Sequence, residues 1–231
     1  MIRVSQLSQK YGGTQILWDL DLSIEPGSCT CIMGRNGVGK TTLLKCLMGL
    51  LPVHSGRIEL NGQAIEGTAA EQRPYQGIGY VPQGREIFPL LTVEENLRLG
   101  LPVRKDKTRS IPDRIFELFP VLGDMLHRRG GDLSGGQQQQ LAIGRALVMD
   151  PKVLILDEPN EGIQPNIVKQ IGDVILKLNE EEGMTVILVE QKLGFARRVG
   201  KEFRLMEKGR VVASGLMPDL TDALIAKHLA V

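Results

Sequence analysis

The chain lacks the features that mark membrane-spanning, exported and metal-chelating proteins. No apolar run approaches the roughly 20 residues of a membrane-spanning helix, and Met1–Gln6 lacks the apolar core of a signal peptide. We therefore expect the chain to stay in the cytosol. It has only three cysteines, without metal-ligand spacing. Cys29 and Cys31 would share one face of a strand, which favours two small buried hydrophobic residues.

A strong charge of either sign is also missing. The formal net charge is +1, so the chain has no general attraction for nucleic acid or for an anionic membrane surface. Hydrophobic residues make up 42% and charged residues 24%, which is ordinary for a soluble globular protein. The length of 231 residues suffices for one domain with a large buried core, so we treat 1–231 as a single domain.

What the chain does contain is a glycine-rich loop, Gly34–Thr41, with the pattern G-x-x-x-x-G-K-[ST]. A buried strand is predicted before it and a helix after it, and this context argues against a chance glycine turn. Such a loop directs backbone N–H groups and a helix N-terminus at phosphate oxygens. Lys40 can reach the β- and γ-phosphates of ATP, and the Thr41 hydroxyl can bind Mg²⁺. The residues expected to contact nucleotide are Gly34, Arg35, Asn36, Gly37, Val38, Gly39, Lys40, Thr41 and Thr42.

The remaining pattern predicts an α/β fold. Apolar strands that alternate with helices indicate a mainly parallel sheet covered by helices. Early antiparallel strands make the fold mixed, and a helical subdomain at about 84–150 is expected as an insertion into the core. The expected strands are 2–7, 15–22, 28–33, 57–60, 78–81, 153–156, 185–189, 203–206 and 211–213, with a hairpin turn at 61–62. The expected helices are a glycine-loop helix ending near 49, one opened by a capping box at 92–95, and 111–122, 137–149 and 165–181.

Two carboxylates end the buried strand in Val153–Pro159. In a protein with the phosphate-binding loop, Asp157 is expected to hold Mg²⁺, directly or through water. Glu158 is expected to polarise the water that attacks the γ-phosphate. An acidic turn at a strand end is common by itself, and its pairing with the glycine loop disfavours that plainer interpretation.

A second anion-binding turn lies at Asp132–Gln137, where Ser-Gly-Gly begins a helix. One ATP does not need two such sites in one subunit, but two subunits arranged head to tail would use both. The run Leu133–Gln137 resembles the signature of the ABC (ATP-binding cassette) ATPases, and the resemblance covers essentially the whole chain. It implies that Ser134, Gly135, Gly136 and Gln137 contact the partner's ATP.

The same resemblance implies two further roles. Tyr11 would stack on adenine, and Gln83 would sense Mg²⁺ and the attacking water and report to the helical subdomain. Taken alone, Tyr11 could simply pack beside a turn and Gln83 could be a polar turn residue; the complete set of motifs favours the functional roles.

A narrower resemblance concerns the class of transporter. Tyr80–Pro89 and Leu141–Leu147 are similar to importers of branched-chain amino acids and related small polar solutes, and Glu158–Pro165 is most similar to urea-import ATPases. This implies a subunit bound to the inner face of the cell membrane through two permease subunits, served by a solute-binding protein. An export ATPase remains an alternative. A non-transport ATPase acting on ribosomes or DNA fits less well, since the chain has no fused second cassette, heptad run or basic tract.

Three positions depart from the usual ABC pattern. Gln191 stands where most members carry a histidine, and a glutamine amide can donate a hydrogen bond to phosphate but cannot become a cation. We expect a weakened site and a non-identical ATPase partner that carries the histidine. Gln164 replaces a common Asp, and Asn160 replaces a small hydroxyl residue. His54, His127 and His228 receive no role.

Overall fold

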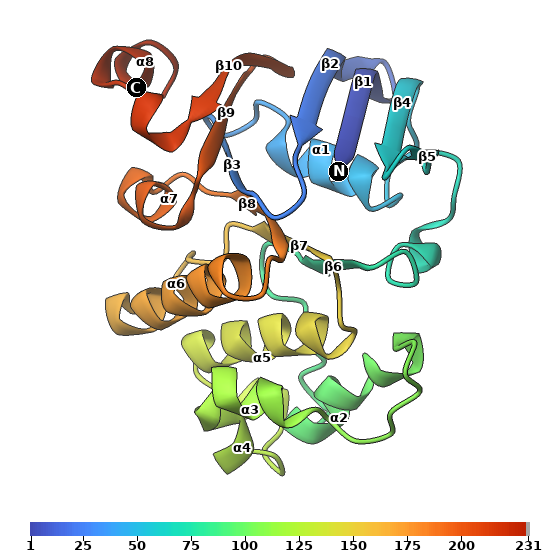
Figure 1. Cartoon of the computed structure of the whole chain (residues 1–231), viewed down its shortest axis with the longest axis vertical. Helices are drawn as coiled ribbons and strands as arrows, with labels where there is room; N and C mark the ends of the chain where they lie inside the picture. The colour runs from blue at the N-terminus through green and yellow to red at the C-terminus, as the bar shows by residue number, and fades with distance from the viewer. Residues whose placement is uncertain (230–231) are drawn as a thin grey trace.

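The computed structural model describes residues 1–229, which form two sheets and their covering helices (Figure 1). The first sheet has four strands in the order β2-β1-β4-β5, and its paired strands are antiparallel. The Asn61-Gly62 turn joins β4 to β5 with φ of 51° and 81°, the positive values that a tight hairpin needs, as predicted. The strands are β1 (Ile2–Tyr11), β2 (Thr14–Ile24), β4 (Ser55–Leu60) and β5 (Gln63–Ala64).

The second sheet has six strands in the order β10-β9-β3-β8-β7-β6. Its neighbouring strands are parallel except β9 and β10, which confirms the predicted mixed, mainly parallel sheet. Strands β3, β7 and β8 are buried at every position, and this explains why their sequences are continuous apolar runs. The strands are β3 (Cys29–Met33), β6 (Ile78–Val81), β7 (Val153–Asp157), β8 (Thr185–Val189), β9 (Glu202–Glu207) and β10 (Arg210–Leu216).

Alternating side chains divide the core between the two faces of this sheet. Leu156 and its neighbours pack with α5 (Gly135–Val148), α6 (Pro165–Glu180) and α7 (Leu193–Val199). Ile155 and its neighbours pack with α1 (Lys40–Leu47) and the four-stranded sheet. All three cysteines are buried and unbridged, as expected for small hydrophobic residues.

A helical segment separates β6 from β7 and forms the lower part of Figure 1. The prediction of one helix over 111–122 was wrong. Phe119, at φ −134° and ψ 74°, interrupts it, because Pro120 disfavours the helical conformation in the residue before it. The elements of the segment are α2 (Val93–Arg98), α3 (Asp113–Leu118), α4 (Pro120–Asp124) and α5.

Shorter elements complete the chain. The predicted capping box opens α2: Glu95 N donates to Thr92 Oγ1 at 3.1 Å, and Thr92 N donates to Glu95 Oε2 at 2.7 Å. Helix α8 (Asp222–His228) follows the last strand. No helix within 1–229 is long and apolar enough to cross a bilayer. Single 3-10 turns lie at Ala70–Gln72, Leu101–Val103, Gly130–Asp132 and Met217–Asp219.

The order of the parallel strands decides where the chemistry-bearing segments meet. Strands β3, β8, β7 and β6 are consecutive neighbours and point the same way, so their carboxyl ends share one edge of the sheet. The glycine-rich loop follows β3, Gln83 follows β6, Glu158 follows β7, and Gln191 follows β8. In open α/β sheets, this edge is where ligands bind.

Candidate active site

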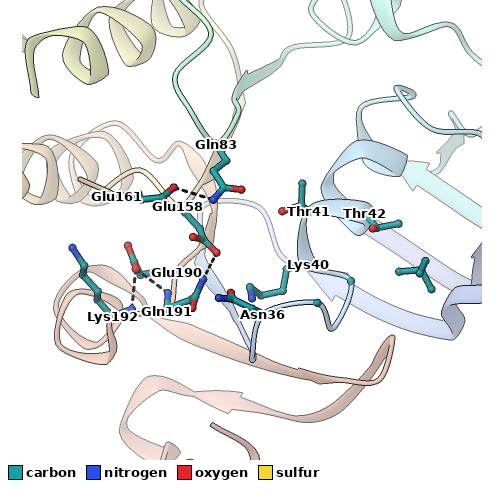
Figure 2. Close-up of a pocket in the computed structure, with 13 residues that line it drawn as sticks. Asn36, Lys40, Thr41, Thr42, Gln83, Glu158, Glu161, Glu190, Gln191 and Lys192 are labelled. Carbon is teal, nitrogen blue, oxygen red and sulfur yellow. Dashed lines mark hydrogen bonds between the residues drawn. The ribbon is translucent and has the colours of Figure 1, made fainter. Parts of the chain in front are cut away.

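A cleft of about 770 Å³ opens at this edge of the sheet (Figure 2). Four predicted segments, well separated in sequence, line it together. The lining residues are Ile16, Asn36, Gly37, Gly39, Lys40, Thr41, Thr42, Gln83, Glu158, Glu161, Glu190, Gln191 and Lys192. The structure therefore brings the glycine-rich loop, Gln83, Glu158 and Gln191 into one site.

Gly34 and Gly39 of the glycine-rich loop must be glycine for different reasons. A Cβ on Gly34 would lie 2.5 Å from the carbonyl oxygen of Met206 on β9, so the close approach of the two segments excludes a side chain. Gly39 has φ of 104°, a conformation that other residues rarely adopt, and it leads directly into α1. The loop thus ends at a helix N-terminus whose N–H groups can bind phosphate.

Lys40 is the buried cation of this loop, with 5% of its surface exposed. Its ammonium donates to the carbonyl oxygens of Gly34 at 2.8 Å and Arg35 at 2.9 Å. Burial lowers the pKa of Lys40, while the negative charges of Glu158 and Asp157 act in the opposite direction. Since carbonyl groups are neutral, they orient the ammonium without cancelling its charge, which suits a site for phosphate oxygens.

Asp157 has the surroundings expected of a cation ligand. It is 1% exposed, and neither carboxylate oxygen has a hydrogen-bond partner within the described part of the chain. Burial is the main cause that raises the pKa of Asp157 to about 6; the nearby Thr41 hydroxyl lowers this pKa, and the Glu158 charge raises it further. A buried carboxylate with no partner is costly unless a cation compensates it. Together with the oxygens of Thr41 and Gln83, Asp157 therefore fits a Mg²⁺ ion.

Glu158 and Gln191 meet because β7 and β8 are neighbours in register, with Asp157 opposite Val189. Glu158 N donates to Val189 O at 2.9 Å, and Glu158 has φ of 49°, a strained conformation for a residue with a side chain. Gln191 Nε2 donates to Glu158 Oε1 (Figure 2). The residue at the expected histidine position thus holds the proposed base directly.

Gln83 reaches the same cleft from the end of β6. Its Nε2 donates to Glu161 Oε2 at 2.9 Å, which leaves the amide oxygen on the other side, toward Thr41 (Figure 2). Arg85, close behind it, donates to Gln138 Oε1 on α5 at 3.1 Å. This segment therefore links the cleft to the helical segment.

Sequence reasoning missed several residues of the cleft. Ile16 on β2 lines it, as do Glu161, Glu190 and Lys192. Ile16 gave no signal beyond one apolar residue in a strand. Glu190 and Lys192 flank Gln191 directly after the buried strand β8, and this position could have predicted that they line the cleft.

Eight of the predicted nucleotide-binding residues lie outside the cleft lining, as does Asp157; three of the eight, Gly34, Arg35 and Val38, belong to the glycine-rich loop itself. Tyr11 is 46% exposed at the end of β1, where it pairs with Thr14, and its adenine contact stays a prediction. Ser134, Gly135, Gly136 and Gln137 form the start of α5. There Gln137 N donates to Ser134 Oγ at 3.4 Å and Ser134 N donates to Gln137 Oε1 at 2.9 Å. This capping leaves the Ser134 hydroxyl proton available to an acceptor outside α5.

Comparison with known proteins gives a consistent picture. A family profile described as "ABC transporter" matches residues 17–161. The branched-chain amino acid transport ATP-binding protein BraG of Pseudomonas aeruginosa strain PAO1 is 40% identical, over 92% of this chain and 91% of its own. The probable branched-chain amino acid transport ATP-binding protein LivF of Archaeoglobus fulgidus is 39% identical, over 96% and 94%.

Solved structures agree with the fold. The ATP-binding cassette MJ1267 in its ADP conformation superposes with a TM-score of 0.85 at 26% identity, covering 98% of this chain and 97% of its own. A dimeric post-hydrolysis structure of the cassette MJ0796, bound to ADP and Pi, gives 0.83 at 26% identity, covering 94% and 99%.

Proposed function

The chain belongs to the ABC transporter family as an ATP-hydrolysing, ATP-binding subunit, and we propose that it powers the import of a small polar solute. The observation that carries the import proposal is its identity of 40% and 39% to two branched-chain amino acid transport subunits over more than nine-tenths of its length. The export alternative has no such support. These two relatives give no support to a role on ribosomes or DNA either.

In the proposed mechanism, the glycine-rich loop and Lys40 bind the ATP phosphates. Glu158 orients a water molecule against the γ-phosphorus and accepts its proton as the new P–O bond forms and the bond to the ADP oxygen breaks. The bond from Gln191 Nε2 to Glu158 supports this role, because it fixes the carboxylate in the cleft while the second oxygen stays available to water.

Mg²⁺ would be held by Thr41, Gln83 and Asp157. When bound, this ion neutralises phosphate charge and so favours transfer to water. Residues 1–229 contain no cluster of three or more His, Cys, Asp or Glu side chains suited to a metal. Nucleotide phosphates would therefore supply part of the coordination, which is how Mg²⁺ commonly binds in ATPases.

Two ATPase subunits would close head to tail, so that Ser134 and Gly136 of each contact the ATP of the other. We propose a non-identical second subunit, two permease subunits on the inner face of the cell membrane, and a solute-binding protein. The exposed side chain of Ser134, outside the subunit's own cleft, supports this arrangement. ATP binding would close the pair and hydrolysis would reopen it, which moves the permease.

We favour a branched-chain amino acid as the solute, following BraG and LivF. Urea is the second candidate, because residues Glu158–Pro165 resemble the urea-import ATPases. The complex that copurifies with this chain, reconstituted in vesicles, should accumulate leucine in an ATP-dependent manner. Accumulation of urea but not leucine would reverse our choice, and ATP-driven export of either would overturn the import proposal.

A further inference from the structure

Asn160 and Glu190 form a buried pair beside the proposed catalytic residues. Asn160 is 1% exposed and Glu190 is 3% exposed. Asn160 Nδ2 donates to Glu190 Oε2 at 2.8 Å. The pair joins the turn after β7, which carries Glu158, to the segment after β8, which carries Gln191.

The other oxygen of Glu190 organises the backbone around Gln191. Glu190 Oε1 accepts from the backbone N–H groups of Gln191 and of Lys192, each at 2.8 Å. Figure 2 shows this carboxylate beside Gln191 and Lys192. The direction in which the Gln191 side chain leaves the chain is therefore set by one buried carboxylate, and Asn160 holds that carboxylate from the other side.

A second bond ties the same two segments together. Lys192 Nζ donates to the backbone carbonyl of Asn160 at 3.0 Å. The side chain and the carbonyl of Asn160 are thus both bound to the segment 190–192. The amide oxygen of Asn160 has no hydrogen-bond partner among residues 1–229, so its polar contact with Glu190 rests on the one Nδ2 bond.

We propose that Asn160 and Glu190 are positioning residues for ATP hydrolysis: their buried hydrogen bond fixes the backbone of 190–192 so that the Gln191 amide is held on Glu158. The inference rests on the proposed roles of Glu158 and Gln191. The proposal also explains why asparagine stands at position 160 in place of a small hydroxyl residue. The Asn160 amide donates a hydrogen bond to the buried Glu190 carboxylate, which needs a donor.

A swap of donor and acceptor tests the pair. Asn160→Asp places two carboxylates, both acceptors, against each other, and should lower kcat about tenfold or more while the ATP dissociation constant changes less than about twofold. Adding Glu190→Gln restores a hydrogen bond of opposite direction, since the new amide can donate to the carboxylate at 160. The double variant should regain kcat to within about threefold of the parent.

Asn61→Asp is the matched control, because it makes the same chemical change on an exposed turn remote from the cleft. It should leave kcat and ATP affinity unchanged. Thermal unfolding of each variant reports on folding. Equal loss of kcat in Asn160→Asp and in the double variant, with both folded, would overturn the proposal.

A double-mutant cycle tests whether Asn160 acts through Gln191. Asn160→Ala should lower kcat about tenfold in the parent but less than about twofold in the Gln191→Ala background. A purely structural role would give the same factor in both backgrounds, and that result would refute the inference. If Glu158→Gln hydrolysed ATP normally, the proposed catalytic role would fail first, so the two failures are distinguishable.

Discussion

In the proposed mechanism Glu158 accepts the proton of the attacking water, and its surroundings suit this role. The hydrogen bond from Glu158 N to Val189 O holds its backbone at φ of 49°. Gln191 Nε2 donates a hydrogen bond to one of its carboxylate oxygens. Strain of this kind persists only where the neighbouring structure enforces it. Lys40 is proposed to bind the ATP phosphates and Glu158 to accept the proton, so binding and hydrolysis should depend on different residues.

Glu158→Gln should keep ATP affinity and lower kcat about 10²- to 10⁴-fold, because an amide cannot accept the proton of the attacking water. Lys40→Ala should instead weaken ATP binding about tenfold or more, since it removes a charged donor to phosphate. Equilibrium binding of ATP and phosphate release measure the two effects separately. Full hydrolysis by Glu158→Gln would contradict the proposed base.

Asp157 makes the stability of the metal-free protein depend on pH. Its pKa is about 6 in the folded chain, against about 4 in an unfolded chain. Between these values the folded state binds a proton that the unfolded state has lost, so stability falls as the pH rises through this window. The loss is complete above pH 6 and amounts to about 2 to 3 kcal/mol.

In EDTA, Asp157→Asn should therefore raise the free energy of unfolding by about 2 kcal/mol at pH 7.5 and have little effect at pH 4. Denaturant titrations at the two pH values measure this. Asp124→Asn, on an exposed carboxylate, serves as the control. An equal effect of Asp157→Asn at both pH values would show that ionisation is not the cause.

The N-termini of helices α2 and α5 have similar local structure but different proposed roles. Helices α2 and α5 both begin with a capping box, at Thr92 and at Ser134. Only the second begins with two consecutive glycines, whose backbone N–H groups are proposed to bind an anion. The same local structure thus serves stability alone in α2 and is proposed to serve stability and ATP contact in α5.

Ser134→Ala and Thr92→Ala should each cost about 1 kcal/mol of stability, because each removes a cap. Only Ser134→Ala should impair ATP hydrolysis. In a pair with the unchanged partner ATPase subunit, Ser134→Ala should impair hydrolysis of the ATP bound by the partner, whereas Lys40→Ala should impair binding of ATP by this chain. A loss of hydrolysis confined to the ATP bound by the Ser134→Ala subunit itself would show that Ser134 acts on its own subunit's ATP.

In the proposed arrangement, this molecule supplies one half of each ATP site. Its cleft assembles the loop, the carboxylates and Gln191, while Ser134–Gln137 lies outside that cleft. A second subunit is needed to complete the proposed site. Because Gln191 cannot become a cation, the site of this chain is expected to be the weaker one of a non-identical pair.

The purified chain should therefore hydrolyse ATP slowly, and addition of the partner ATPase subunit and the permease should raise turnover about tenfold or more. Within the complex, Gln191→Ala should lower turnover less than Glu158→Gln does, because it removes one hydrogen-bond donor rather than the base. Phosphate release by the chain and by the complex measures this. Cooperative hydrolysis by the chain alone at the rate of the complex would make Gln191 a full substitute for histidine.

Local patterns in the sequence determined the glycine-rich loop, the buried strands β6 and β8 to the residue, and the capping box at Thr92. These features depend on neighbours within a few residues, so short-range periodicity and capping chemistry suffice to predict them. The break at Phe119 also had a local cause, in Pro120, which the prediction of a single helix overlooked.

Only the tertiary structure decided how the site is assembled. The bonds from Gln191 to Glu158 and from Asn160 to Glu190 join segments about thirty residues apart in sequence, with α6 between them. They exist because β7 and β8 are adjacent and in register, and strand order is a property of the packed sheet rather than of either strand. Ile16 lines the cleft because β2 packs beside Gly39 of the glycine-rich loop, which is another contact between segments distant in sequence.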